Sequence, residues 1–151
     1  MKRLSLLLLL ALLGMTPTAS SFAVEEEIVV IVNQANPAQA AGRDTLRPIF
    51  QTTRTEWFGR SAMPVNLPED SSLRQRFDLA VLGLDPDAVA RYWIDRKIRG
   101  GERPPRKVAT PNAVVRAVGE EVGGIGYVGA GDVNPSVKVI ARIRAGQVVA
   151  P

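Results

Sequence analysis

The stretch IVVIV, residues 28–32, decides the fold class. It is apolar at every position and rich in β-branched side chains, which favours a strand covered on both faces. Ile125 to Val128, between glycines, predicts a second short strand. Val137 to Ile143 alternates apolar with basic residues, which predicts a half-exposed terminal strand. Because helical segments separate these strands, we expect one α/β domain with a small mixed sheet and helices packed on it.

Four helices are predicted from their capping residues. The segment Asp70-Ser71-Ser72 contains only N-cap residue types and precedes an amphipathic run that Gly83 stops. Asp85-Pro86 and Thr110-Pro111 each combine a cap with a proline at the first helical position. A shorter helix is expected to run from Asp44, as its N-cap, through Phe50.

Residues 1–23 have the three-part layout of a secretory signal. Lys2 and Arg3 precede an apolar run, Leu4 to Leu13, and Ser21-Phe22-Ala23 places small residues where a signal peptidase cleaves. The alternative is an uncleaved membrane anchor, but a spanning helix needs about 20 apolar residues and this run is shorter. We therefore expect cleavage after Ala23, a domain spanning residues 24–151, a periplasmic location and no integral membrane segment.

Composition narrows the function further. The chain has no cysteine and no histidine, which excludes disulfides, thiol chemistry and histidine-based triads and argues against a zinc site. Without Lys2 and Arg3, 17 basic side chains face 15 acidic ones, and no dense basic stripe interleaved with aromatic residues is present. We therefore expect no nucleic-acid partner, no cofactor, no metal and no enzymatic activity.

Two motifs each allow two interpretations. The glycine-rich run from Gly123 to Gly131 is either a nucleotide-binding loop or a strand that passes close to other backbone. The loop interpretation lacks the Lys-Ser/Thr that a P-loop needs. The start at Asp70-Ser71-Ser72 is either a simple cap or a cradle for an oxyanion, because free N–H groups and the helix dipole both favour an anion there.

The order and spacing of these landmarks resemble the phosphate-type substrate-binding proteins of ABC transporters. The resemblance covers Ile28 to Val128. It is carried by the following residues: Val29-Val30-Ile31-Val32-Asn33, Asn36-Pro37, Leu46-Arg47-Pro48-Ile49-Phe50, Trp57, Gly59, Pro64-Val65-Asn66, Ser71-Ser72, Phe77, Trp93, Gly100-Gly101, Pro104, Gly123 and Ile125-Gly126-Tyr127-Val128. Such proteins have two lobes of the periplasmic-binding-protein type II fold, joined by hinge strands, with the anion bound between the lobes.

The resemblance implies that the runs at Ile28 and Ile125 are the hinge strands and that the chain is a single lobe. It also implies that Ser71 and Ser72 lie where the family binds phosphate or another small oxyanion. The family's arginine falls on Leu67, which cannot supply the same bidentate charge. We therefore expect weak oxyanion binding or none. The alternative is a periplasmic module that has lost its ligand and binds a protein partner, or itself, through the exposed inter-lobe face.

Overall fold

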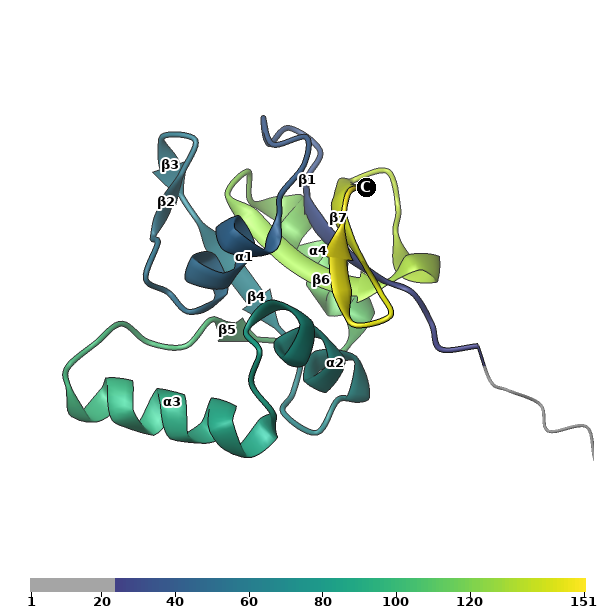
Figure 1. Ribbon diagram of the computed structural model, residues 1–151. Coiled ribbons are helices and arrows are strands. Elements are labelled where there is room, and N and C mark those ends of the chain that lie inside the picture. Colours follow the sequence, from purple (N-terminus) through teal and green to yellow (C-terminus); the bar gives the residue numbers. More distant parts are fainter. Residues whose placement is uncertain (1–23) are drawn as a thin grey trace, which may run out of the picture.

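The computed structural model describes residues 24–151, and the expected signal peptide lies outside the described residues. A six-stranded sheet forms the centre, in the order β5-β4-β6-β1-β7-β8 (Figure 1). β1 is antiparallel to β6 and β7, whereas β4 is parallel to β6 and β5, so the sheet is mixed as predicted. The bounds are β1 Ile28–Asn33, β4 Met63–Asn66, β5 Arg106–Lys107, β6 Gly124–Gly129, β7 Val137–Arg144 and β8 Gln147–Val149.

Four helices complete the described domain, together with a short 3-10 helix, Ala130–Asp132, and a two-stranded sheet. The helices are α1 Arg43–Phe50, α2 Ser72–Val81, α3 Pro86–Ile98 and α4 Pro111–Glu120, and the small sheet pairs β2 Glu56–Trp57 with β3 Arg60–Ser61. α3 lies farthest from the main sheet, and a long loop connects it to β5 (Figure 1). None of the helices in residues 24–151 is long and apolar enough to cross a membrane.

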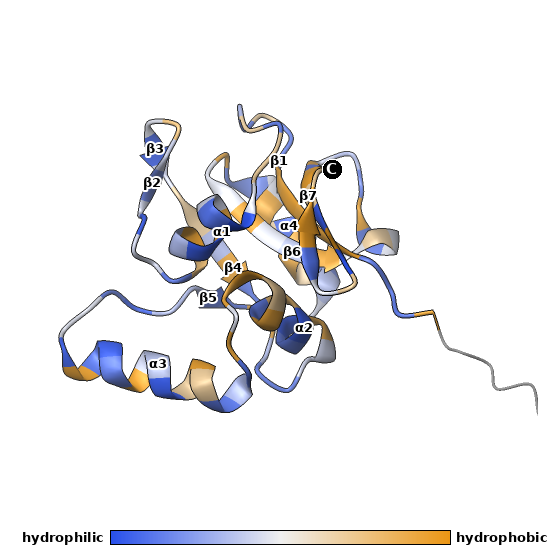
Figure 2. Ribbon diagram, in the orientation of Figure 1, coloured by the Kyte–Doolittle hydropathy of each residue, from blue (hydrophilic) through white to orange (hydrophobic). Residues whose placement is uncertain are grey.

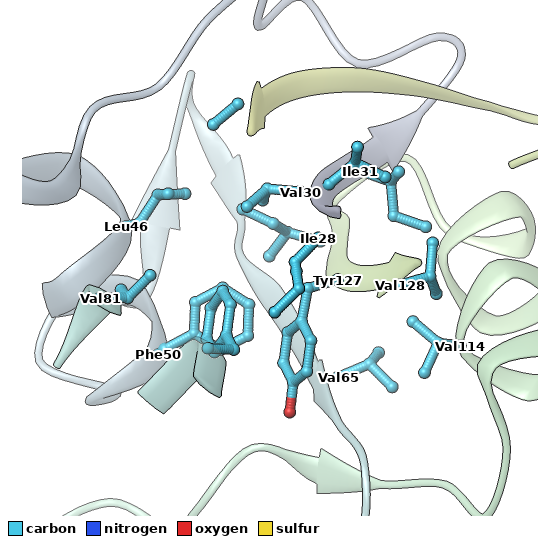
Figure 3. Packing of buried hydrophobic residues seen from close by; sticks show 14 of the residues in the cluster. Ile28, Val30, Ile31, Leu46, Phe50, Val65, Val81, Val114, Tyr127 and Val128 are labelled. Atoms are coloured by element: carbon cyan, nitrogen blue, oxygen red, sulfur yellow. The ribbon is translucent and has the colours of Figure 1, made fainter. Parts of the chain in front are cut away.

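The core lies on both faces of the sheet. On one face Tyr127 of β6 stacks on Phe77 of α2 with ring centroids 3.8 Å apart, and Phe50 of α1 meets Phe77 edge-on at 4.7 Å (Figure 3). On the other face Val114 of α4 lies beside Val128. Hydrophobic residues are concentrated on β1, β4 and β7 (Figure 2). β1 is fully buried, which confirms the prediction of a strand covered on both faces.

The capping predictions are confirmed for three helices and wrong for one. Ser71, Asp85 and Thr110 each accept a hydrogen bond from a backbone N–H of the first turn of α2, α3 and α4. α1 instead begins after Gly42, whose carbonyl accepts the Thr45 and Leu46 N–H groups. Asp44 lies inside the first helical turn, where its charge favours the positive end of the helix dipole without capping it.

β7 is not the terminal strand that the alternation predicted. Ala145 and Gly146, with φ of 47° and 73°, turn the chain back into β8, which covers the outer edge of β7. The alternation is also interrupted, because the register of β1 on β7 shifts between Val30 and Ile31. As a result two successive residues, Ile140 and Ala141, are both buried.

The glycines of β6 allow the close approach of other backbone, and this interpretation of the glycine-rich run is confirmed. A Cβ on Gly124 would lie 2.8 Å from Val118 Cα and 2.9 Å from Val118 O. A Cβ on Gly126 would lie 2.6 Å from a methyl group of Val114. α4 therefore packs directly on the backbone of β6.

We expect Gly124→Ala to lower the free energy of unfolding by about 1–3 kcal/mol, because the added methyl group forces α4 away from the sheet. Gly131→Ala is the matched control, since a Cβ there would meet only Glu26 Oε1 at 4.0 Å. We expect the control to change stability by less than about 0.5 kcal/mol. Urea unfolding followed by circular dichroism measures both values, and equal stabilities of the two variants would contradict the close packing.

Candidate functional site

The segment between β4 and α2 is where the sequence placed the oxyanion donors. Ser71 is the N-cap of α2, and its Oγ accepts the backbone N–H of Arg74 at 3.4 Å. Ser72 is the first helical residue and is exposed. The capping interpretation of Ser71 is therefore confirmed, while the oxyanion role of Ser71 and Ser72 stays a prediction.

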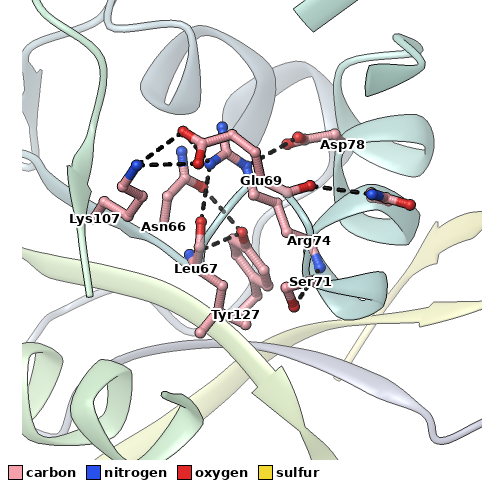
Figure 4. A network of polar contacts seen from close by, with 9 residues as sticks. Asn66, Leu67, Glu69, Ser71, Arg74, Asp78, Lys107 and Tyr127 are labelled. Atoms are coloured by element: carbon pink, nitrogen blue, oxygen red, sulfur yellow. Dashed lines mark hydrogen bonds and ion pairs between the residues drawn. The ribbon is translucent and has the colours of Figure 1, made fainter. Parts of the chain in front are cut away.

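Leu67, at the position where the resembling family has arginine, points into the core and is 2% exposed. Its backbone N–H donates to the hydroxyl of Tyr127 at 3.3 Å. The same hydroxyl donates to Asn66 Oδ1 at 3.0 Å (Figure 4). Burial raises the pKa of Tyr127 far above its usual value, so the phenol stays neutral and keeps this proton. Tyr127 thus connects β6 to the end of β4 and fixes the start of the segment.

Arg74, which sequence reasoning did not select, is the central cation of this region. The residue is 4% exposed, and its Nη1 donates to the carbonyl of Leu67 at 2.9 Å. Its Nε donates to Asp78 Oδ2 at 3.2 Å, and Nη1 lies 3.3 Å from Glu69 Oε1 (Figure 4). The Arg74–Asp78 spacing of four residues on a helix was visible in the sequence, but its burial was not.

Asp78 has a strongly shifted ionisation. Burial raises the pKa of Asp78 to about 6, although the charge and the hydrogen bond of Arg74 act in the opposite direction. The negative charge of Glu69 adds a further, smaller increase. Glu69 itself is paired with Lys107 of β5, whose Nζ lies 3.0 and 3.2 Å from its two carboxylate oxygens. The helix start therefore has a carboxylate, that of Glu69, beside its donors.

A cavity of about 500 Å³ opens beside this network. Its floor is polar and comes from β4, β5 and α2, and its wall comes from α3 and the loop that follows it. The residues that line it are Asn66, Glu69, Arg74, Gln75, Asp78, Pro86, Val89, Ala90, Trp93, Arg103, Pro104, Pro105 and Lys107. Ser71 and Ser72 are not part of this lining, so the cavity and the helix start are separate features.

Metal coordination has no support in the described part of the chain. Residues 24–151 contain no group of three or more aspartate or glutamate side chains placed to hold a metal ion, and histidine and cysteine are absent from the sequence. The chemistry open to this region is hydrogen bonding and ion pairing.

No family model matches this chain, and no curated protein matches it. Several solved structures, however, are similar to this chain. An ABC-type phosphate transport receptor from Vibrio cholerae is 21% identical with a TM-score of 0.61, over 76% of this chain and 45% of that one. A putative phosphate ABC transporter substrate-binding protein with bound phosphate, from Clostridium perfringens, is 18% identical with a TM-score of 0.63, over 76% and 44%. A possible phosphate binding protein from Planctomyces limnophilus is 17% identical, with a TM-score of 0.54 over 77% and 41%.

This chain thus spans less than half the length of the solved structures that it resembles. At these identities the likeness concerns the fold. The mixed sheet with helices on both faces matches the fold of these structures, and the partial coverage is that of one lobe. The chain therefore has the α/β fold of a single lobe of the periplasmic-binding-protein type, as the sequence resemblance predicted.

Proposed function

We propose that this chain is an exported, non-enzymatic domain related to the substrate-binding proteins of phosphate ABC transport, and that it binds phosphate or another small oxyanion weakly or not at all. One observation carries the proposal: within residues 24–151 the one buried arginine, Arg74, is already engaged by two carboxylates and a carbonyl. Leu67 supplies no charge at the position where the resembling family has arginine.

Some capacity for an anion remains at the start of α2. The Ser71 oxygen accepts a hydrogen bond, so its own proton is still free to be donated. The first N–H groups of a helix also have no partner within the helix. Against these donors stand the exposed carboxylates of Glu69 and Asp70, which repel an anion. The balance supports an affinity far below that of a dedicated transport receptor.

The periplasmic location rests on the signal-like sequence of residues 1–23. The absence of histidine and cysteine from the sequence supports a binding role over a catalytic one. A second candidate, a module that binds a protein partner or a second copy, is favoured by a specific observation. Ile94 and Ile98 lie one helical turn apart on α3 and are 61% and 78% exposed.

For phosphate, we expect a dissociation constant no lower than about 1 mM, equivalent to about −4 kcal/mol. Ser71→Ala removes a donor and should weaken this binding further, whereas Ser72→Ala should have the smaller effect. Because Ser71→Ala also removes a cap that contributes about 1 kcal/mol, both variants are compared at a temperature where they are fully folded. Isothermal titration calorimetry and NMR titration measure the constants. A submicromolar constant for the wild-type chain would overturn the proposal.

The state of Asp78 is testable through the pH dependence of stability. Because the pKa of Asp78 is about 6 in the folded protein, against an ordinary value of 3.8, the folded state binds this proton more tightly. The resulting stability is fully present below about pH 4 and is lost as the pH rises through about 6, a change of about 3 kcal/mol. Asp78→Asn removes this dependence. Relative to wild type, the variant should therefore gain stability between about pH 4 and 7 in urea unfolding. A difference that stays constant with pH would contradict the burial of a charged carboxylate.

A further inference from the structure

The cavity between α2, α3 and the loop at residues 103–105 has donors that the proposed oxyanion function does not use. Asn66 and Arg74, which are 5% and 4% exposed, both line it. Among residues 24–151, neither Asn66 Nδ2 nor Arg74 Nη2 donates a hydrogen bond to another residue, and neither is one of the fully enclosed nitrogens that lack a partner. An accessible donor without a protein partner binds water or a ligand. These two nitrogens are therefore available to an acceptor inside the cavity.

The direction of both donors is fixed by neighbouring groups. The Tyr127 hydroxyl accepts a hydrogen bond from the Leu67 N–H and donates one to Asn66 Oδ1. Because Oδ1 faces Tyr127, Nδ2 of Asn66 points away from it. Asp78 and the carbonyl of Leu67 hold two other nitrogens of Arg74. In Figure 4 the Glu69 carboxylate lies between Lys107 and Arg74, which leaves Nη2 of Arg74 and Nδ2 of Asn66 as the remaining donors. Donors whose orientation is fixed in advance bind an acceptor at a smaller entropic cost.

The charges that line the cavity leave one positive charge in excess. Arg74, Arg103 and Lys107 stand against the carboxylates of Glu69 and Asp78. Both carboxylates already form ion pairs. Asp78 pairs with Arg74, and Glu69 pairs with Arg74 and Lys107. Arg103 is the additional cation, and it lies on the loop at the rim. An anionic ligand complements this arrangement better than a neutral one.

The opposite wall of the cavity is apolar. Val89, Ala90 and Trp93 contribute from α3, and Pro104 and Pro105 contribute from the following loop. Trp93 is only partly buried against the core, so part of its ring surface stays available. A cavity of about 500 Å³ is within the range of small-molecule sites, which combine an apolar wall with a few fixed polar groups.

We propose that this cavity binds a small organic acid, with its carboxylate on Asn66 Nδ2 and Arg74 Nη2 and beside Arg103 at the rim, and with a ring-sized apolar body against Trp93 and the α3 wall. The site is distinct from the helix start at Ser71 and does not depend on phosphate binding. Inorganic phosphate has no apolar part with which to use the α3 wall, so it is a poor ligand for this cavity.

Three acids serve as probes, namely 4-phenylbutyrate, indole-3-propionate and octanoate, with 4-phenylbutan-1-ol and butyrate as matched partial ligands. We expect at least one acid to bind and to shift the amide signals of α2 and α3 in NMR titration of the purified protein. The alcohol should bind about tenfold more weakly than 4-phenylbutyrate, because it cannot form charge-assisted hydrogen bonds. Butyrate should also bind more weakly, because it lacks the apolar body.

Two variants of α3 form a matched pair. Ala90→Trp places a large side chain at an exposed position in the lining and should abolish binding of the acids. Ile94→Trp places the same side chain on the same helix outside the lining and should leave binding unchanged. Arg103→Gln, at an exposed position in the lining, should weaken binding of the acids but not of the alcohol.

Three results would overturn the proposal. The first is no acid binding up to about 10 mM, a dissociation constant equivalent to a binding free energy of about −3 kcal/mol. The second is equal affinity of 4-phenylbutyrate and its alcohol, and the third is equal loss of binding in Ala90→Trp and Ile94→Trp. Phosphate titration of Ala90→Trp separates this proposal from the proposed function. Blocking the cavity should change acid binding and leave any phosphate response unaltered.

Discussion

Strand β1 pairs along both edges and is buried on both faces, and this constraint determines where the other elements lie. Its edges are occupied by β6 and β7, so the sheet must extend outward from it in both directions. Its apolar faces must each be covered, because exposed strands of this composition would bind other chains. α4 covers one face, and α1 and α2 cover the other, which is why the described domain has helices on both sides of a single sheet.

Strand β6 transmits this arrangement to the candidate site through the alternation of its side chains. Gly124 and Gly126 face α4 and let it approach the backbone, whereas Tyr127 faces the aromatic side chains of α1 and α2. The Tyr127 hydroxyl then reaches the end of β4 and fixes Asn66 and Leu67. The position of α2, and with it Arg74, follows from the same contacts. The polar network is therefore an extension of the core.

Local features of the sequence predicted local structure well. The caps at Ser71, Asp85 and Thr110 were correct because a cap depends on residues within one turn. The prediction of Asp44 as a cap was wrong because the helix already begins after Gly42, whose carbonyl accepts the N–H groups of Thr45 and Leu46. The cavity could not be predicted, since its lining joins β4, α2, α3 and the loop before β5, and only packing brings these together. The pairing of Arg74 with Asp78 was visible as a spacing, but burial alone makes it chemically unusual.

The buried Arg74–Asp78 pair is better explained by orientation than by stability. Removing two charges from water costs free energy that their attraction often fails to recover, and the raised pKa of Asp78 indicates such a cost here. What the pair does is fix the orientation of the Arg74 guanidinium. Asp78 and the Leu67 carbonyl hold the guanidinium in one plane and leave its remaining nitrogen in a fixed direction. At the helix start the carboxylates of Glu69 and Asp70 oppose a free phosphate ion, while beside the apolar wall of α3 the fixed nitrogen of Arg74 is available to a ligand that brings its own hydrophobic surface.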